Sequence, residues 1–289
     1  MLTEAGGGLG KLDLYKILFL LSEEADLPRE ASHEFVPYHR GPYSFTLAYD
    51  LKSLEAAGLI TQSKERVEAT SKGEAEAAKT TRPLASVVAS TLRRHGQKET
   101  TALVDHVYET YPWFTVNSKW TERRAYARPV ADIAIFTTSY EGVQVDGLLN
   151  RLMKAGIQRL IDVRFNPVAR RYGFHRSTLA SLCPMVGIEY RHIPELGIPG
   201  AWRADLGSSD SYDLLFGRYA NEVLPDQDST LLSLIEIIKS APTALMCKEA
   251  DPTCCHRTTL ANELAARTGL PVIDLADEGD AEEVAPGLF

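Results

Sequence analysis

The feature that most constrains the fold of this chain is an alternation of short apolar runs with amphipathic stretches, which begins near residue 133. Candidate strands occupy 133–136, 159–164, 188–193, 243–247 and 271–275, and helical patterns occupy about 145–153, 178–186, 211–223, 229–240 and 256–268. Strands that alternate with helices favour a parallel sheet covered by helices on both faces. We therefore expect an open, mainly parallel α/β domain over residues 131–276, followed by an acidic tail at 277–289.

Ligands of such domains bind beyond the carboxyl ends of the strands. This rule selects residues without any motif: Tyr140, Asp162, Arg164, His192, Glu195, Cys247 and Glu249. We expect only one of Asp162 and Arg164 to face the crevice. His192 and Glu195 are candidates for an acid or base, although a single histidine at a strand end is often a hydrogen-bonded structural residue.

Three of the four cysteines, Cys247, Cys254 and Cys255, lie close together and are followed by His256 and Arg257. The segment leaves an apolar run, crosses a proline-containing loop and enters a helix at His256. Backbone N–H groups at a helix start favour an anion and lower the pKa of a thiol there. The segment is therefore a candidate reactive site.

Three interpretations of this segment stay open. Cys247 or Cys255 is a nucleophile with His256 or a carboxylate as its base. Alternatively, Cys247, Cys255 and His256, with or without Cys254, hold a metal, although the usual Cys-x2-Cys knuckle is absent. In the third interpretation Cys247 is a small core residue at a strand end. The sequence requires no cofactor, and a metal at Cys247, Cys255 and His256 is compatible with it.

A second polar segment follows the run at 159–164. Arg170, Arg171 and Tyr172 precede Phe174 and His175, and this mixture of arginine and aromatic residues is suited to gripping a phosphate and stacking a base. The alternative is structural, with an arginine–aspartate pair bracing the sheet end.

The first 80 residues favour short helices followed by a small hairpin, with candidate strands at 59–61 and 66–70. Ser44 is a candidate N-cap and Gly58 a candidate helix terminator. This order is typical of a winged helix, whose capped helix is presented to DNA. The stretch GGGLGKL near the start is a near miss for a phosphate loop, and we expect a flexible leader there.

The charge distribution limits nucleic-acid binding to one region. The chain carries 31 basic and 39 acidic side chains, a net charge of −8, which excludes a broadly basic surface. Residues 81–130, which we expect to form a basic helical connector, are the exception with eight basic and four acidic residues. The candidate DNA contacts are Arg40, Tyr43, Lys52, Arg93, Arg94, Arg123 and Arg124. Against DNA binding, the capped helix has Asp50 and Glu55 beside Lys52 alone.

Four cysteines are too few for a disulfide scaffold, so we expect reduced thiols and a cytoplasmic protein. No apolar run approaches the roughly 20 residues that span a bilayer, and the first residues lack a signal-peptide core. We therefore expect no membrane partner.

Two resemblances extend this interpretation. The motifs "DVR", "GIEYRHIPELG" and "LMCKEADPTCCHRTTLANEL" resemble the family called domain of unknown function 488 over about 132–275, which implies a Rossmann-like α/β fold. On that family's pattern, Cys247, Glu249, Cys255, His256 and Arg257 fall on "C-x-E…C-H-R" positions. The phrase "YHRGPYSFTLAYDLKSLEAAGLI" resembles a winged-helix module of bacterial and phage-associated antitoxin-like proteins.

Our preferred hypothesis is a hydrolase or lyase that acts on a nucleic-acid base or nucleotide, in DNA repair, processing of modified DNA or phage defence. Its candidate catalytic residues are Cys247, Glu249, His256 and Asp162, and its candidate substrate contacts are Tyr140, Arg164, Arg170, Arg171, Tyr172, His192 and Arg257. The expected partner is nucleic acid, DNA first. The alternatives are a DNA-binding regulator that senses a ligand, metal or oxidant through the cysteines, and a protein-binding or homodimerising winged helix.

Overall fold

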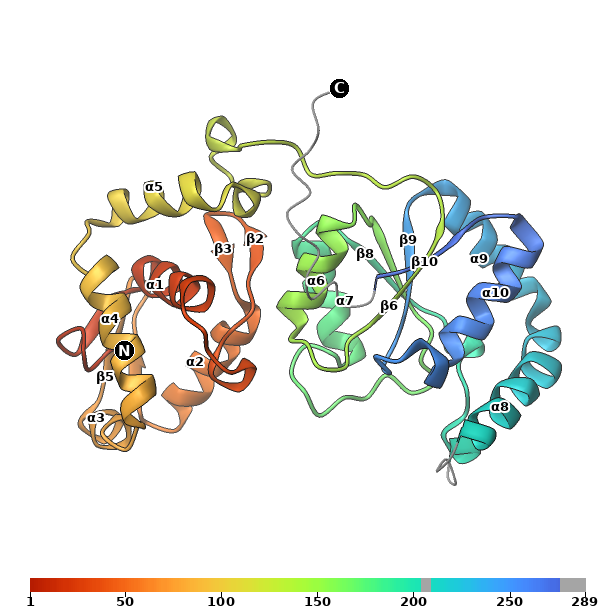
Figure 1. The fold of residues 1–289 in the computed structure, drawn as a ribbon, viewed down its shortest axis with the longest axis horizontal. Coiled ribbons are helices and arrows are strands. Elements are labelled where there is room, and N and C mark those ends of the chain that lie inside the picture. Colours follow the sequence, from red (N-terminus) through yellow and green to blue (C-terminus); the bar gives the residue numbers. More distant parts are fainter. Residues whose placement is uncertain (204–208, 276–289) are drawn as a thin grey trace. The chain divides into compact units, whose positions relative to one another are not determined.

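The computed structural model describes residues 1–203 and 209–275, which form two compact units (Figure 1). The N-terminal unit comprises Met1–Arg128 together with Gln144–Asn150. The α/β unit comprises Pro129–Val143 and the described residues from Arg151 onward. The acidic tail expected at 277–289 lies outside the described residues.

The α/β unit is built on a five-stranded sheet whose strand order is β10-β6-β9-β7-β8. Every neighbouring pair in this sheet is parallel, which confirms the predicted parallel α/β architecture. The strands are β6 (Ile135–Ser139), β7 (Arg159–Asp162), β8 (Glu189–His192), β9 (Thr243–Cys247) and β10 (Val272–Asp274). The central strand β9 therefore separates β6 from β7, the first two strands of this sheet along the chain.

Helices cover both faces of this sheet. In Figure 1, α6 (Val145–Lys154) and α7 (Arg176–Met185) lie on one side, and α8 (Ser209–Arg218), α9 (Asp228–Ser240) and α10 (His256–Thr268) lie on the other. Along the chain, the strands advance across the sheet in one direction from β6 through β7 to β8, and in the opposite direction from β8 through β9 to β10. Because crossovers between parallel strands are right-handed, the helices of the first half and those of the second half lie on opposite faces. The chain leaves β9 toward α10 on one face of the sheet, whereas it leaves the two neighbouring strands, β6 and β7, toward α6 and α7 on the other face. Such switch points open crevices at the carboxyl ends of the strands.

Most element boundaries in the α/β unit agree with the sequence pattern, and β9 and α10 have the expected bounds. One difference concerns the single helix expected at 211–223. The structure has α8 followed by a π-helical segment, Tyr219–Val223. Tyr219 is fully buried there, and its hydroxyl donates to the carbonyl oxygen of Leu196 at 2.7 Å. A local change of helical period of this kind depends on such tertiary contacts, which periodicity along the chain does not reveal.

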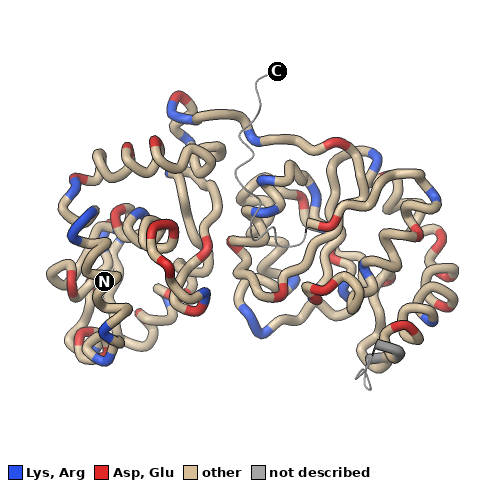
Figure 2. Tube along the Cα trace, viewed as in Figure 1, with Lys and Arg blue, Asp and Glu red and all other residues tan. Residues whose placement is uncertain are grey.

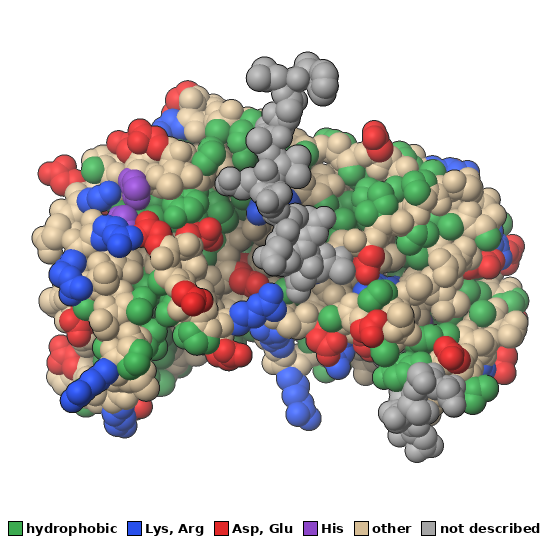
Figure 3. All heavy atoms as spheres, viewed as in Figure 1, with side chains coloured by type: hydrophobic (Ala, Val, Ile, Leu, Met, Phe, Trp, Pro, Cys, Tyr) green, Lys and Arg blue, Asp and Glu red, His purple; other side chains and the backbone are tan. Residues whose placement is uncertain are grey.

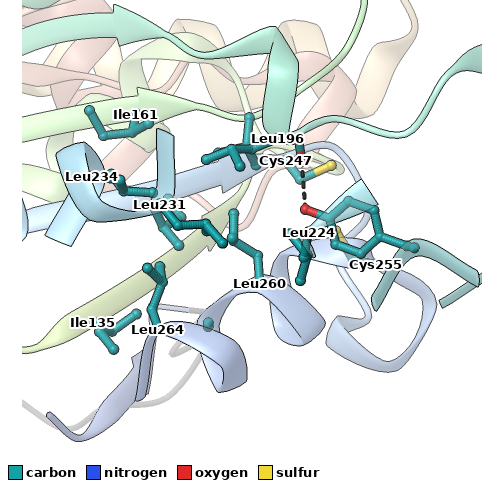
Figure 4. Close-up of a cluster of buried hydrophobic side chains, with 14 of the residues drawn as sticks. Ile135, Ile161, Leu196, Leu224, Leu231, Leu234, Cys247, Cys255, Leu260 and Leu264 are labelled. Atoms are coloured by element: carbon teal, nitrogen blue, oxygen red, sulfur yellow. Dashed lines mark hydrogen bonds between the residues drawn. The ribbon is translucent and has the colours of Figure 1, made fainter. Parts of the chain in front are cut away.

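The core on the α9–α10 face of the sheet extends to the edge that carries the cysteines. Strand residues such as Ile135, Ile161 and Leu245 pack there against Leu231, Leu234, Leu260 and Leu264 from the two helices. Cys247 and Cys255 belong to the same cluster and lie at one end of it, near Leu196 and Leu224 (Figure 4). Burial of each leucine contributes about 2 kcal/mol to the free energy of folding. Because the two thiols pack within this cluster, the same contacts hold them in place.

The N-terminal unit combines helices with small antiparallel sheets. The strand order of its three-stranded sheet is β1-β5-β4, and β2 pairs with β3 in a separate hairpin. Its elements are β1 (Gly8–Gly10), α1 (Lys11–Glu24), β2 (Val36–Tyr38), β3 (Gly41–Tyr43), α2 (Phe45–Ala56), β4 (Ile60–Gln62), β5 (Arg66–Ala69), α3 (Ser71–Ala77), α4 (Arg82–His95) and α5 (Thr100–Thr110). Ser44 caps α2 by accepting a hydrogen bond from the amide of Leu47 at 3.1 Å, as its sequence position predicts.

The expectation of a flexible glycine-rich leader is wrong for residues 8–10. Gly8–Gly10 forms β1, which pairs with β5 in antiparallel register. At Gly8 a Cβ atom would lie 2.8 Å from the Cγ of Glu68, so glycine permits the close approach of the two strands. Backbone pairing needs no side-chain periodicity, which explains why the pattern missed this strand.

The basic segment 81–130 contributes to the core of the N-terminal unit. Helices α4 and α5 supply Leu92, Leu103 and Val107, which pack in the same cluster as Leu20 of α1. The segment is therefore largely a packed part of this unit. No helix among the described residues is long and apolar enough to cross a membrane. All four cysteines are free thiols, as expected.

Candidate functional site at the carboxyl edge of the sheet

Three strand ends bring the candidate residues together. Ser139 pairs with Cys247, so Tyr140 emerges beside the end of β9. On the other side of β9, Asp162 pairs with Met246. The polar residues that the sequence rule selected at β6, β7 and β9 therefore share one edge of the sheet, at the switch points that flank β9.

The chemical centre of this edge is the thiol of Cys247. Its Sγ donates a hydrogen bond to Oε2 of Glu249 at 3.2 Å and lies 3.6 Å from Nδ1 of His256. Cys247, Cys255 and His256 are each about 1% exposed. The thiol therefore has two proton acceptors within reach in a nearly water-free environment.

The position of His256 also fixes its tautomer. Its Nε2 lies 3.1 Å from the carbonyl oxygen of Val163, and a carbonyl can only accept. Nε2 therefore carries a proton, and Nδ1 of the neutral ring presents its lone pair to Cys247. The ring of Tyr219 contacts the imidazole edge-on, with centroids 5.4 Å apart, and holds its plane.

Cys255 lies immediately before α10, where its thiol joins the same cluster. Burial raises the pKa of this thiol well above its usual value, and the neighbouring Cys247 raises it further, although His256 acts in the opposite direction. The expectation that the helix start would lower the pKa of a thiol is therefore wrong for Cys255. Desolvation and the neighbouring Cys247 outweigh the effect of His256 on this pKa, so the thiol form of Cys255 is favoured.

Arg257 is a fully buried cation next to this cluster. Its guanidinium donates to the carbonyl oxygens of Glu249 and, at 3.1 Å, Ala250, and it pairs with Asp274 at 3.4 Å. Burial opposes the charged form, but Cys255 and Asp274 together raise the pKa of Arg257 above its usual value. Nε of Arg257 is buried and has no hydrogen-bond partner among the described residues. The helix start thus carries a fixed positive charge with one unused donor.

Asp162 and Arg164 form a two-pronged ion pair, with Nε to Oδ1 at 2.8 Å and Nη2 to Oδ2 at 2.6 Å. The expectation that only one of them would face the crevice is wrong, because side chains two residues apart on extended chain point to the same side of the sheet. The same guanidinium donates to the hydroxyl of Tyr140 at 3.0 Å and to the carbonyl of Phe174 at 2.9 Å. Tyr190, which the sequence reasoning missed, donates to Asp162 at 2.7 Å.

A signal for Tyr190 was present in the sequence. It lies two residues before His192 on β8, so the two side chains share one face of the sheet. His192 contacts the carbonyl oxygen of Arg164 through Nε2 at 2.8 Å, which leaves its buried Nδ1 without a partner among the described residues. Glu195 is exposed in the short turn after β8. The bond from His192 therefore braces the segment after β7.

The segment after β7 carries the predicted arginine and aromatic residues in two groups. Phe174 is fully buried and stacks on Tyr140, with centroids 4.3 Å apart and planes inclined by 17°. Arg170 and Arg171 are exposed, and Tyr172 is half-buried. Burial raises the pKa of Tyr140, although the adjacent Arg164 partly offsets this effect. The aromatic pair thus belongs to the wall of the site, whereas the two arginines face solvent.

The candidate DNA contacts of the N-terminal unit occupy several elements. Arg40, Lys52 and Arg93 are exposed, and the ring of Tyr43 stacks on Tyr15 at 4.8 Å. Three arginines already have partners within the unit: Arg94 with Glu24 at 2.8 Å, Arg123 with Asp105 and Arg124 with the carbonyl of Ser118 at 2.7 Å. Figures 2 and 3 show acidic residues interspersed with basic ones along this unit.

The cysteine cluster can support two kinds of chemistry, and both require a thiolate. Proton transfer from Cys247 to His256 or Glu249 would create a nucleophile. Alternatively, the deprotonated sulfurs and the imidazole would bind a metal, because one donor atom from each of Cys247, Cys255 and His256 lies within 4.8 Å of the others. Cys254 is not in this group; its Sγ lies 3.8 Å from Asp251 instead.

Comparison with known proteins identifies one family. The family model described as "Domain of unknown function DUF488" matches residues 144–264, which confirms the predicted resemblance over that part of the chain. This stretch contains β7, β8 and β9 and the residues from Cys247 to Arg257. No curated protein and no solved structure matched the chain.

Proposed function

We propose that this chain, whose residues 144–264 belong to the DUF488 family, is an enzyme that processes a nucleic-acid base or a nucleotide. The observation that carries the proposal is the contact of the Cys247 thiol with both Glu249 and His256 at a switch point of a parallel sheet. Such crevices are the usual ligand sites of open α/β sheets. The reaction class is hydrolysis or lysis, with the Cys247 sulfur acting as thiolate.

The substrate class follows from the segment after β7. Exposed Arg170 and Arg171 supply charge for a phosphate, and Phe165, 49% exposed, offers a ring for stacking a base. Arg257 supplies a second, buried positive charge at the start of α10. Together these groups are suited to a ligand that has an anionic part and a planar part.

Asp162 has a different part in this proposal. Both of its carboxylate oxygens accept hydrogen bonds from Arg164, and Tyr190 adds a third bond. A carboxylate occupied in this way is suited to holding Arg164 and Tyr140 in position. We therefore assign Asp162 a positioning role and keep Cys247, Glu249 and His256 as the catalytic residues.

In this proposal the N-terminal unit brings nucleic acid to the enzyme. The capped helix α2, followed by the antiparallel strands β4 and β5, has the order of a winged helix, which supports this role. The basic residues of this unit are interspersed with acidic ones and several are already paired, so the proposal includes weak binding without sequence preference. Lys52, Arg40 and Arg93 are the exposed cations that contact phosphate.

The test is turnover by substituted proteins. The full chain is incubated with nucleotides and with DNA that contains modified bases, and released products are separated by mass. We expect Cys247→Ala and Glu249→Ala to lower kcat by at least about 100-fold, the scale of losing a proton-transfer group. Cys254→Ala removes a neighbouring thiol outside the cluster and is expected to leave kcat unchanged.

The melting temperature of each variant must stay within a few degrees of the wild-type value, so that loss of activity does not reflect unfolding. Full activity of both Cys247→Ala and Glu249→Ala on a substrate that the wild-type chain turns over would refute the assigned site.

A second candidate function is favoured by the near-complete burial of the cluster, since Cys247, Cys255 and His256 are each about 1% exposed. Buried thiols suit a DNA-binding regulator whose α/β unit senses a metal or an oxidant. Such a regulator binds one DNA sequence with nanomolar affinity and releases it on treatment with zinc or peroxide. Product release from DNA of many sequences supports the enzyme instead.

A further inference from the structure

We propose that Cys247, Cys255 and His256 form a zinc site, which is the working centre of the enzyme proposed above. The inference concerns the same residues but is measured by metal content, so it can stand or fall separately from turnover. It assigns a metal-binding role to Cys247 and Cys255, the two buried cysteines of the cluster, and leaves the half-exposed Cys254 outside the site.

The donor atoms have the spacing that a tetrahedral zinc ion requires. Zinc–sulfur bonds of about 2.3 Å and zinc–nitrogen bonds of about 2.0–2.1 Å at tetrahedral angles place sulfur and nitrogen about 3.6 Å apart. The distance from Sγ of Cys247 to Nδ1 of His256 is 3.6 Å. The donors of all three residues lie within 4.8 Å of one another, so a small closure suffices to bind the ion.

The donor set selects the kind of metal. Two sulfurs and an imidazole nitrogen suit zinc, whereas magnesium and calcium require oxygen ligands. Three protein ligands also match the arrangement of catalytic zinc sites, in which the fourth position is open. Glu249 contacts Cys247 at 3.2 Å and is therefore close to the space that a fourth ligand would occupy. On metal binding Cys247 and Cys255 would each release one proton to solvent.

The surroundings of the ligands support the same conclusion. Metal-binding histidines usually donate their other ring N–H to a carbonyl or carboxylate, and Nε2 of His256 does so to Val163 at 3.1 Å. This bond aims the Nδ1 lone pair at the two thiols. A second supporting group is the buried Nε of Arg257, which lacks a partner among the described residues, beside Cys255. A thiolate at Cys255 would give this donor an acceptor.

A buried cation at the helix start also favours thiolate ligands. Arg257 is fully buried beside Cys255, and its ion pair with Asp274 is long, at 3.4 Å. A positive charge this close to Cys255 favours the deprotonated sulfur that a zinc ion requires.

The experiment measures metal bound to the full chain. The protein is reduced, stripped with a chelator, incubated with Zn²⁺ or Co²⁺ and desalted before elemental analysis. We expect about one ion per chain, and for cobalt an absorption band from thiolate-to-metal charge transfer. Cys247→Ser and Cys255→Ser should each retain less than about a tenth of that metal, because each removes a thiolate ligand.

Cys254→Ser is the matched control, because it removes the adjacent thiol outside the site, and it should bind metal as the wild type does. Circular dichroism checks that the variants are folded. The proposal is overturned if the wild-type chain retains no metal, or if Cys247→Ser and Cys255→Ser retain as much as the wild type. The first of these outcomes does not depend on any variant folding. Metal binding without turnover on any substrate would refute the proposed function and leave the site intact.

Discussion

Lys16 is a fully buried lysine in the N-terminal unit, and it illustrates how a single residue limits stability. Its Nζ donates to the carbonyl oxygen of Arg40 and lies 5.9 Å from the centroid of the Tyr108 ring. Burial lowers the pKa of Lys16 from 10.5 to about 7. The folded chain therefore binds this proton less tightly than the unfolded chain does.

The lowered pKa of Lys16 makes stability depend on pH. Between pH 7 and pH 10.5 the unfolded state holds more protons at this site, so the free energy of unfolding rises with pH across that window. We expect Lys16→Met to raise the free energy of unfolding at pH 7 by a few kcal/mol and to remove the rise. Urea titrations at pH 7 and pH 9.5 measure both effects.

The exposed Lys64 gives a control for Lys16. Lys64→Met should leave both the stability and its pH dependence as in the wild type. If the wild-type chain and Lys16→Met show the same change between the two pH values, Lys16 keeps an ordinary pKa and the argument from burial fails.

At the level of elements, the ion pair of Asp162 and Arg164 joins several parts of the sheet edge. Arg164 contacts Tyr140 after β6 and Phe174 before α7, and Asp162 accepts from Tyr190 of β8. The two ion-pair residues are 0% and 6% exposed. Removing one partner of such a pair leaves a buried charge uncompensated, whereas removing both is far less costly.

This geometry predicts a strong coupling between the two residues. Asp162→Asn should lower the free energy of unfolding by about 3–5 kcal/mol, and adding Arg164→Met should restore part of the loss. Denaturant unfolding of the wild type, Asp162→Asn, Arg164→Met and the double variant forms a double-mutant cycle that measures this coupling. Glu189→Gln breaks more exposed ion pairs with Arg159 and Arg191 on the same sheet and should cost about 1 kcal/mol or less.

The cycle also tests the positioning role of Asp162. If Asp162→Asn is as stable as the wild type yet loses all turnover, the carboxylate acts in the reaction itself. If the two effects of the single substitutions simply add, the ion pair does not brace the strand ends.

For the whole molecule, the net charge of −8 and the dispersed cations of the N-terminal unit predict weak binding to DNA. We expect a dissociation constant of about 10⁻⁴–10⁻⁶ M that weakens as salt increases, as for phosphate contacts without base recognition. The combined change Lys52→Glu and Arg93→Glu should weaken binding at least several-fold. Fluorescence anisotropy with labelled duplexes at two salt concentrations gives both quantities.

Lys239→Glu, on α9 of the α/β unit, reverses one charge outside the proposed surface and should have little effect on affinity, in contrast to Lys52→Glu or Arg93→Glu alone. Nanomolar binding to a single sequence would contradict weak phosphate binding and favour the regulator. No effect of the combined variant would mean that α2 and α4 do not contact DNA.

The sequence predicts a helix or a strand correctly where the hydrophobic pattern along the chain is compatible with only one kind of element. The run Thr243–Cys247 and the helix His256–Thr268 were predicted with their observed bounds, because continuous apolar residues and a helical period are visible along the chain. Gly8–Gly10 was missed because glycines carry no such pattern. The π-helical turn at Tyr219–Val223 was missed because it depends on distant contacts.

The candidate site divides in the same way. By itself, the sequence determined that Tyr140, Asp162 and Cys247 lie at the carboxyl ends of strands and that parallel strands end at one edge of a sheet. Only the tertiary structure decided that β9 lies between β6 and β7, and therefore which of these ends are neighbours. It also decided that the Val163 carbonyl orients His256 toward Cys247. Strand order and side-chain contacts arise from packing between segments distant in sequence, which no local periodicity encodes.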